Sequence, residues 1–207
     1  MAAPDSLRIL SWNVLRKVGA GAEDVAELIG RLKPDLVLLQ EADRAMERLP
    51  QLVGGSFARD AFPGRIHGPA VWSPRPIVRP NLVFLTGGHT RRHAQVVDLG
   101  SVTIVNVHLA HGQLACRRQL REAARAITGA GAVIGDFNMI GPATLPEFSD
   151  VGPREPTHMA RDLVPVRIDR CFVRGMVCHA ATALPTGRSD HRPMLLELSA
   201  ARSVLAA

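Results

Sequence analysis

The stretch Ala132-Val-Ile-Gly-Asp-Phe-Asn-Met139 (AVIGDFNM) decides how the rest of the chain is interpreted. Its small and β-branched apolar residues predict a buried strand that ends at Gly135, followed by Asp136 and Asn138. Because side chains alternate along extended chain, these two polar residues are expected to share one side, while Phe137 turns toward the core. Folds of the α/β class place their chemistry at such strand ends. An Asx-type turn would explain this octet alone, so other strand ends must decide.

Length and composition predict one domain over residues 1–207, with a core from about 7 to 198. The sequence lacks a signal-peptide pattern and lacks the roughly 18 consecutive apolar residues that a membrane helix needs. We therefore expect a cytoplasmic protein, without stable membrane association and monomeric. The three cysteines, Cys116, Cys171 and Cys178, have no CxxC spacing and are expected to be reduced, packed side chains.

The net charge of +6 and the pI near 10.4 fit a polyanionic partner, since guanidinium groups attract phosphates. A compositional bias toward arginine is the competing explanation, because Lys17 and Lys33 are the only lysines. Charge alone therefore does not identify the substrate.

The first part of the chain predicts a strand, a helix and a second strand, at 7–14, 22–33 and 36–40. Asn13 lies near the end of the first strand, and Glu41 directly follows the second. A carboxylate at the end of a buried strand is costly unless it is paired or binds a metal. Alternatively, Glu41 is an ordinary acid before a helix at 42–52.

Further elements are predicted by the same patterns, with loops at 54–80 and 140–167 apart from a short strand at 69–72. They are a helix at 113–128 and strands at 81–86, 94–99, 102–107, 166–173, 177–183 and 194–198. The strand at 177–183 is expected to pair antiparallel with the strand at 166–173. His108 ends one of these strands and, taken alone, favours a structural role, since no third ligand completes a zinc motif.

Six short motifs occur in order along the chain. They are Ser11-Trp-Asn13, Leu39-Gln-Glu41, Asn106-Val-His108, Gly135-Asp-Phe-Asn138, Arg167-Ile-Asp169 and Ser189-Asp-His191. Together they resemble the endonuclease/exonuclease/phosphatase superfamily, which includes exonuclease III-type and DNase I-type enzymes. The resemblance implies an α/β four-layer sandwich of two packed mixed sheets with helices outside. It also implies hydrolysis of phosphate esters with a divalent metal, Mg²⁺ or alternatively Mn²⁺.

The resemblance also implies a role for each motif residue. Glu41 would bind the metal, with Asn13 and Asp190 nearby, because Mg²⁺ favours oxygen ligands. Asp136 would deprotonate or orient the attacking water, and Asn138 would fix that carboxylate or a phosphate oxygen.

The two histidine motifs would contact the phosphate. His191 would donate to a nonbridging oxygen, Asp169 would orient and charge its imidazole, and His108 would approach from the other side.

Two departures from the family pattern disfavour abasic-site repair: the chain has no tyrosine, and Leu15 replaces the acid that follows the first-strand asparagine. The favoured substrate is a DNA or RNA phosphodiester, contacted by Arg75, Arg167, Arg188 and Arg192 beside the motifs. A lipid or small-molecule phosphoesterase and a catalytically inactive binding module remain alternatives, since fold and site do not specify substrate.

Overall fold

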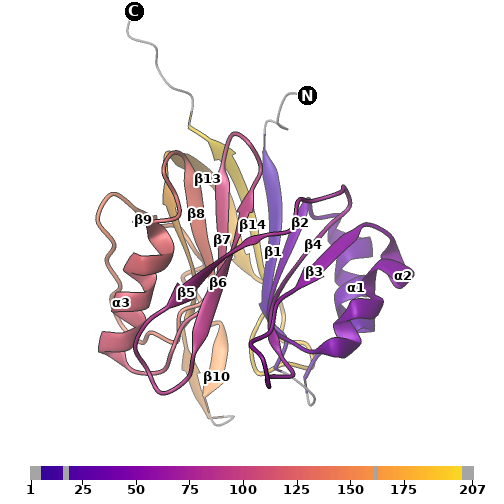
Figure 1. Ribbon diagram of the computed structural model, residues 1–207, viewed down its shortest axis with the longest axis horizontal. Helices are drawn as coiled ribbons and strands as arrows, with labels where there is room; N and C mark the ends of the chain where they lie inside the picture. The colour runs from indigo at the N-terminus through magenta and orange to yellow at the C-terminus, as the bar shows by residue number, and fades with distance from the viewer. Residues whose placement is uncertain (1–5, 16–18, 161–162, 202–207) are drawn as a thin grey trace, which may run out of the picture.

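The computed structural model describes residues 6–15, 19–160 and 163–201. Two six-stranded mixed sheets pack face to face, with helices on the outer faces (Figure 1). This arrangement confirms the α/β sandwich that the sequence motifs implied.

The first sheet combines both ends of the chain, in the order β13-β14-β1-β2-β4-β3. Its strands are β1 (Leu7–Asn13), β2 (Leu36–Ala42), β3 (Ser56–Arg59), β4 (Gly68–Ser73), β13 (Met176–Ala183) and β14 (Met194–Ala200). β1 is parallel to β2 and antiparallel to β14, so it lies at the centre of this sheet.

The second sheet has the order β5-β6-β7-β8-β12-β9. Its strands are β5 (Asn81–Leu85), β6 (Arg92–Asp98), β7 (Thr103–His108), β8 (Gly131–Asp136), β9 (Ser149–Asp150) and β12 (Asp169–Arg174). A separate two-stranded sheet joins β10 (His158–Ala160) to β11 (Val164–Val166). β3 and β9 to β11 lie in segments that the sequence patterns predicted to be loops.

Two longer helices cover the sheets, α1 (Ala22–Leu32) on the first and α3 (Gln113–Ala124) on the second (Figure 1). The single helix expected at 42–52 is wrong. β2 continues to its end at residue 42, a 3-10 helix η1 (Arg44–Arg48) follows, and α2 (Leu49–Val53) is a single short turn. Asp43 caps η1, and Pro50, which cannot donate a backbone hydrogen bond, stands at the start of α2. In the described part of the chain, no helix is long and apolar enough to span a membrane.

The predicted pairing of 177–183 with the preceding strand is also wrong. Both edges of β12 are already occupied, by β8 and β9, so β13 turns at Gly175 and pairs with β14 in the other sheet. Gly175 has a φ of 60°, a conformation that side-chain-bearing residues adopt less readily.

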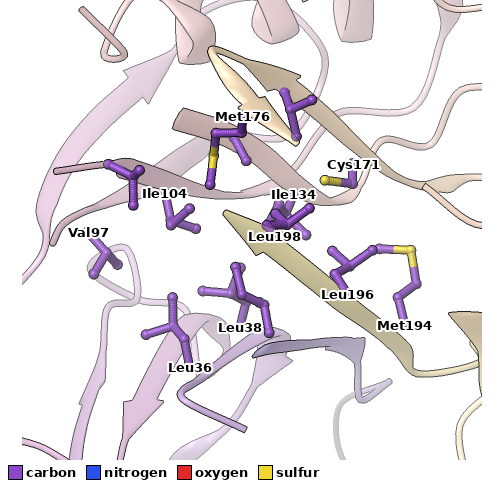
Figure 2. Close-up of a cluster of buried hydrophobic side chains, with 14 of the residues drawn as sticks. Leu36, Leu38, Val97, Ile104, Ile134, Cys171, Met176, Met194, Leu196 and Leu198 are labelled. Atoms are coloured by element: carbon purple, nitrogen blue, oxygen red, sulfur yellow. The ribbon is translucent and has the colours of Figure 1, made fainter. Parts of the chain in front are cut away.

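The inner faces of the two sheets bury the central hydrophobic core. Figure 2 shows side chains from both sheets meeting there, among them Leu36 and Leu196 from one sheet and Ile104 and Ile134 from the other. Two further clusters lie under α1 and under α3. This packing fixes the ends of strands from both sheets relative to one another.

Candidate active site

The site lies where strands from both sheets end. β7 and β8 run parallel, so His108 stands beside Asp136, and the antiparallel β12 sets Asp169 on the other side of Asp136. In the first sheet Asn13 ends β1 beside Gln40 of β2. The strand register alone thus brings Asp136 between His108 and Asp169.

Unusual backbone conformations occur at these strand ends. Gly135 has a φ of 138°, and a Cβ there would lie 2.1 Å from the carbonyl oxygen of Val107. Glu41 and Asn138 have positive φ angles of 58° and 50°, which are rare for residues with side chains. Glu41 also lies where the register between β2 and β4 shifts. Such conformations concentrate at functional sites, where the surrounding structure must stabilise them.

The Asp136 carboxylate is the centre of the site and is 1% exposed. Its Oδ1 accepts a hydrogen bond from the Asn138 backbone N–H at 2.8 Å, and its Oδ2 accepts one from Asn13 Nδ2 at 2.9 Å. Burial raises the pKa of Asp136, as does the neighbouring Asp169, while His191 and these hydrogen bonds lower it; the net shift is upward. A carboxylate of raised pKa, held in place by two amides, is suited to accept a proton.

His191 is held by Asp169, with its Nδ1 2.9 Å from Asp169 Oδ2. Burial lowers the pKa of the His191 imidazole, but the charges of Asp169 and Asp136 outweigh burial and raise it to about 10. The ring is therefore protonated at neutral pH and donates through Nδ1. Its Nε2 lies 3.8 Å from Asp136 Oδ2, beyond hydrogen-bond distance, so that N–H can be donated to a ligand.

The His108 ring is neutral, unlike that of His191. Burial, together with the positive charges of Arg92 and His191, lowers the pKa of His108 well below its ordinary value. Arg92 Nη1 lies 3.1 Å from His108 Nδ1, and because a guanidinium only donates, Nδ1 is the acceptor. The proton of the neutral ring is then on Nε2, which lies 3.4 Å from Asp136 Oδ2.

Buried amides connect the two sheets behind the site. Gln40 Nε2 donates to Asn106 Oδ1 at 2.8 Å, and Asn106 Nδ2 donates to the carbonyls of Leu39 and Ala70 at 3.1 Å. The motif residues Gln40 and Asn106 therefore join the sheets without contacting the reacting groups.

The predicted metal ligands lie on both sides of Asp136. Glu41 Oε1 is 4.0 Å from His108 Nε2, and Asp190 Oδ1 is 4.0 Å from His191 Nε2. Both carboxylates are partly exposed, and Mg²⁺ favours such oxygen ligands completed by water. Among the described residues, the acids and histidines close enough to share one ion are His158, Asp190 and His191, and Asp136, Asp169 and His191. The Asn13 amide is already engaged, with Oδ1 accepting from the Leu15 N–H and Nδ2 donating to Asp136.

All eight predicted site residues therefore lie in one place. Asn13, Asn138, His108 and His191 lie against Asp136, Asp169 and Asp190 lie against His191, and Glu41 lies against His108. Three further residues of the site had no predicted role. Ser189 Oγ donates to the Asn13 carbonyl, Arg92 contacts His108, and the His158 ring lies against that of His191 at 4.3 Å. Only Ser189 carried a signal in the sequence, its place in the last motif.

The four arginines expected at the phosphate are not gathered there. Arg75 lines a cavity with Leu7, at the opposite end of β1 from Asn13. Arg167 is bound to Asp150, and Arg192 donates to the carbonyls of Leu184, Ala183 and Pro156. Arg188 is exposed and lies 3.8 Å from Asp24. Arg167 and Arg192 are thus engaged by other groups and Arg75 lies at the far end of β1, while the role of Arg188 stays a prediction.

Comparisons with known proteins agree with this architecture. A sequence model described as the Endonuclease/Exonuclease/phosphatase family matches residues 10–191. A UPF0294 protein of Klebsiella pneumoniae (strain 342) is 25% identical over 224 residues, which cover 96% of this chain and 84% of that protein.

Among solved structures, an endonuclease/exonuclease/phosphatase from Beutenbergia cavernae DSM 12333 superposes with a TM-score of 0.76 at 20% identity, covering 99% of this chain and 74% of that one. A humanized D. rerio TDP2 gives a TM-score of 0.75 at 17% identity, covering 95% and 100%. At these identities the two structural matches show the shared fold.

Proposed function

Because the chain belongs to the endonuclease/exonuclease/phosphatase family, we propose that it is a Mg²⁺-dependent hydrolase of phosphate esters that acts on DNA or RNA phosphodiesters. Family membership supports the general activity, a phosphoester hydrolase. The observation that carries the proposed mechanism is the position of two histidines on either side of Asp136, with Asp169 against His191 and Arg92 against His108.

In this mechanism Asp136 takes a proton from the attacking water, while Asn13 and Asn138 hold its carboxylate. The water oxygen bonds to phosphorus as the bond from phosphorus to the ester oxygen breaks, and the leaving oxygen takes a proton from solvent. The His191 imidazolium donates from Nε2 to a nonbridging phosphate oxygen as negative charge builds there. Asp169 positions that ring and keeps it charged. His108 donates its Nε2 proton to the phosphate or to Asp136 from the other side.

The bound divalent metal would offset charge on the phosphate oxygens. Glu41 and Asp190 are the ligands we assign to it, and Asn13 acts mainly through Asp136. Mn²⁺ has a similar preference for oxygen and is expected to substitute.

A chelation experiment tests the metal. EDTA should abolish hydrolysis, and added Mg²⁺ or Mn²⁺ should restore it. Glu41→Gln should raise the metal concentration needed for half-maximal activity, because it removes one ligand charge. Glu147→Gln, a change of an exposed acid outside the site, is the control. Full activity in excess chelator would disprove metal-assisted hydrolysis.

A substrate panel tests the reaction class. It should include single-stranded and duplex DNA, RNA, sphingomyelin and a small phosphomonoester, each with and without Mg²⁺. We expect nucleic acids to be turned over fastest. Faster turnover of sphingomyelin or the phosphomonoester would assign the chain to the lipase or phosphatase class, and no turnover of any substrate would favour a binding module.

A further inference from the structure

A recess beside the proposed active site differs from the site in the kinds of side chain that line it. It is formed by the segment between β3 and β4 and by the turn between β5 and β6. Glu41 and His108 line it, as do basic and aromatic side chains that no family motif includes: Phe62, Arg65, His67, Arg91, Arg92 and His93. The recess shares Glu41 and His108 with the site, so the two adjoin and a molecule long enough can contact both.

Aromatic rings stand at this recess. The Phe62 ring centroid lies 4.6 Å from that of His93, in an edge-on arrangement, and 5.7 Å from that of Phe84. Phe84 is 65% exposed on β5, so one of its ring faces can be covered by a ligand. An exposed phenyl ring next to guanidinium groups is suited to stacking against a nucleobase.

His93 carries a polar atom that lacks a partner. The residue is 5% exposed, and among the described residues its Nε2 has no hydrogen-bond partner. Its ring interacts instead with the backbone of Asp60, and burial lowers the pKa of His93, so the ring is neutral. A buried nitrogen without a hydrogen bond carries a free-energy cost, because it has lost its contact with water. A ligand with a hydrogen-bond donor would remove that cost.

The size of the recess limits what enters it. Its volume is about 20 Å³, enough for one water-sized group but not for a ring. A nucleobase would therefore lie at the rim against Phe84, while an amino or hydroxyl group of the same nucleotide reaches inward.

We propose that this recess binds one unpaired nucleotide of a single-stranded nucleic acid, next to the phosphate that is hydrolysed. The base stacks on Phe84, the adjoining phosphate pairs with Arg65 and Arg91, and a base amino or sugar hydroxyl group donates to His93. The inference rests on the proposed function and specifies its substrate.

Charge and geometry favour this ligand over a membrane or a duplex. Both Arg65 and Arg91 are exposed, and Glu41 is the one acid among the described residues that line the recess. A duplex would present paired bases whose faces are covered by their neighbours, so Phe84 could not stack on them.

Binding measured in EDTA tests the recess without turnover. Fluorescence anisotropy would compare a short single-stranded oligonucleotide containing all four bases with an abasic sugar–phosphate chain of the same length. Phe84→Ala should weaken binding of the oligonucleotide about tenfold and leave the abasic chain unaffected, whereas Phe84→Tyr should retain affinity. Arg91→Ala should weaken both ligands and lower the salt slope by about 0.7. Leu114→Ala and Arg121→Ala, exposed changes on α3, should change neither.

The outcomes separate this inference from the proposed function. Base-dependent binding without turnover of any phosphoester would contradict the function and support the recess. Cleavage of nucleic acid with equal affinity of wild type and Phe84→Ala would support the function and overturn the recess. Capture by phosphatidylcholine–phosphatidylserine vesicles that is lost in Phe84→Ala would also overturn it, in favour of a membrane contact.

Discussion

His108 and His191 flank the same carboxylate and are both buried, yet their pKa values shift in opposite directions. The difference comes from their partners. Asp169 lies directly against His191, whereas the neighbour of His108 is the Arg92 guanidinium. Sequence alone could identify both histidines, but not Arg92, which lies outside every motif.

Histidine NMR can measure this difference. Below its raised pKa His191 keeps its proton, so its ring should remain charged across neutral pH and titrate only near pH 10. His108, with a lowered pKa, should stay neutral throughout the same range. Asp169→Asn should return the His191 pKa toward its ordinary value. If both rings titrated near pH 6.5, the assigned charge states would be wrong.

Single substitutions test the reacting groups. Asp136→Ala and His191→Ala should each lower kcat by at least ~10²-fold, the usual effect of losing one acid–base or charge-stabilising group. Circular dichroism should confirm that both variants fold. His179→Ala, a change of an exposed histidine on β13, is the control.

A double-mutant cycle tests whether Asp169 acts through His191. Because one orients the other, combining Asp169→Ala with His191→Ala should cost little more than His191→Ala alone. Effects that multiplied as those of independent sites would argue against the pair.

The end of β8 depends on a glycine. Gly135→Ala would place a Cβ against the Val107 carbonyl at a φ of 138°, so we expect a loss of at least ~1–3 kcal/mol in the free energy of unfolding and a loss of activity. Gly129→Ala is the matched control, since a Cβ there has nothing within 4 Å. Urea denaturation of both variants measures their free energies of unfolding. Equal stability of the two variants would show that β8 can relax around the added methyl group.

The short strand β9 is held by an ion-pair cluster. Asp150 is bound by Arg167 at 2.6 Å and by Arg170 at 2.9 Å, and Arg170 is itself 4% exposed. Burial raises the pKa of Asp150, but these two arginines outweigh burial and lower the pKa below its ordinary value.

The stability contributed by Asp150 is therefore present above the unfolded-state pKa and is lost as pH falls through the lower folded-state value. Asp150→Asn should cost on the order of 3 kcal/mol at pH 7, because it leaves buried guanidinium groups unpaired. The cost should shrink in strong acid, where Asp150 itself is protonated. Urea denaturation at both pH values measures this, with Asp98→Asn at an exposed site as the control. A cost independent of pH would contradict the assigned pKa.

Local sequence patterns predicted most strands and both longer helices, because alternation and helical spacing report burial directly. Which strands pair with one another was harder to predict. Residues 177–183 have strand character, but only the occupied edges of β12 explain why they join the other sheet. Leu114 was expected to face inward on the helix but is 86% exposed, whereas Cys116, in the same first turn of α3, is buried.

At the scale of the whole molecule, the two-sheet sandwich was expected from the resemblance of the six motifs to a known family, since local patterns alone do not indicate two sheets. The arginines beside the site could not be predicted in this way. Arg65 and Arg91 are far from any motif in sequence, and loop geometry brings them to the recess that Glu41 and His108 also line. The single-domain and monomer expectations stay predictions.

The net charge of +6 predicts how nucleic-acid binding responds to salt. Affinity for a non-cleavable single strand should fall steeply as salt rises, with a slope of roughly −0.7 for each neutralised phosphate. The Arg65→Ala and Arg91→Ala double variant should lower that slope by about 1.4, twice the single-phosphate value, while Arg75→Ala, at the far end of β1, should leave it unchanged. Isothermal titration at several salt concentrations would measure the slopes, and a salt-insensitive affinity would contradict a nucleic-acid substrate.

β14 lies beside β1, with Leu198 opposite Leu7, although the two strands are far apart along the chain. A ribosome makes β1, Asp136 and Asp169 long before it makes His191 and the strand that anchors it. During synthesis the first sheet therefore lacks one of the two strands that border β1, although β2, its other neighbour, has already been made. The pairing of β1 is complete only when residues 194–200 have left the exit tunnel, so we expect a chain stalled before that point to expose one edge of β1.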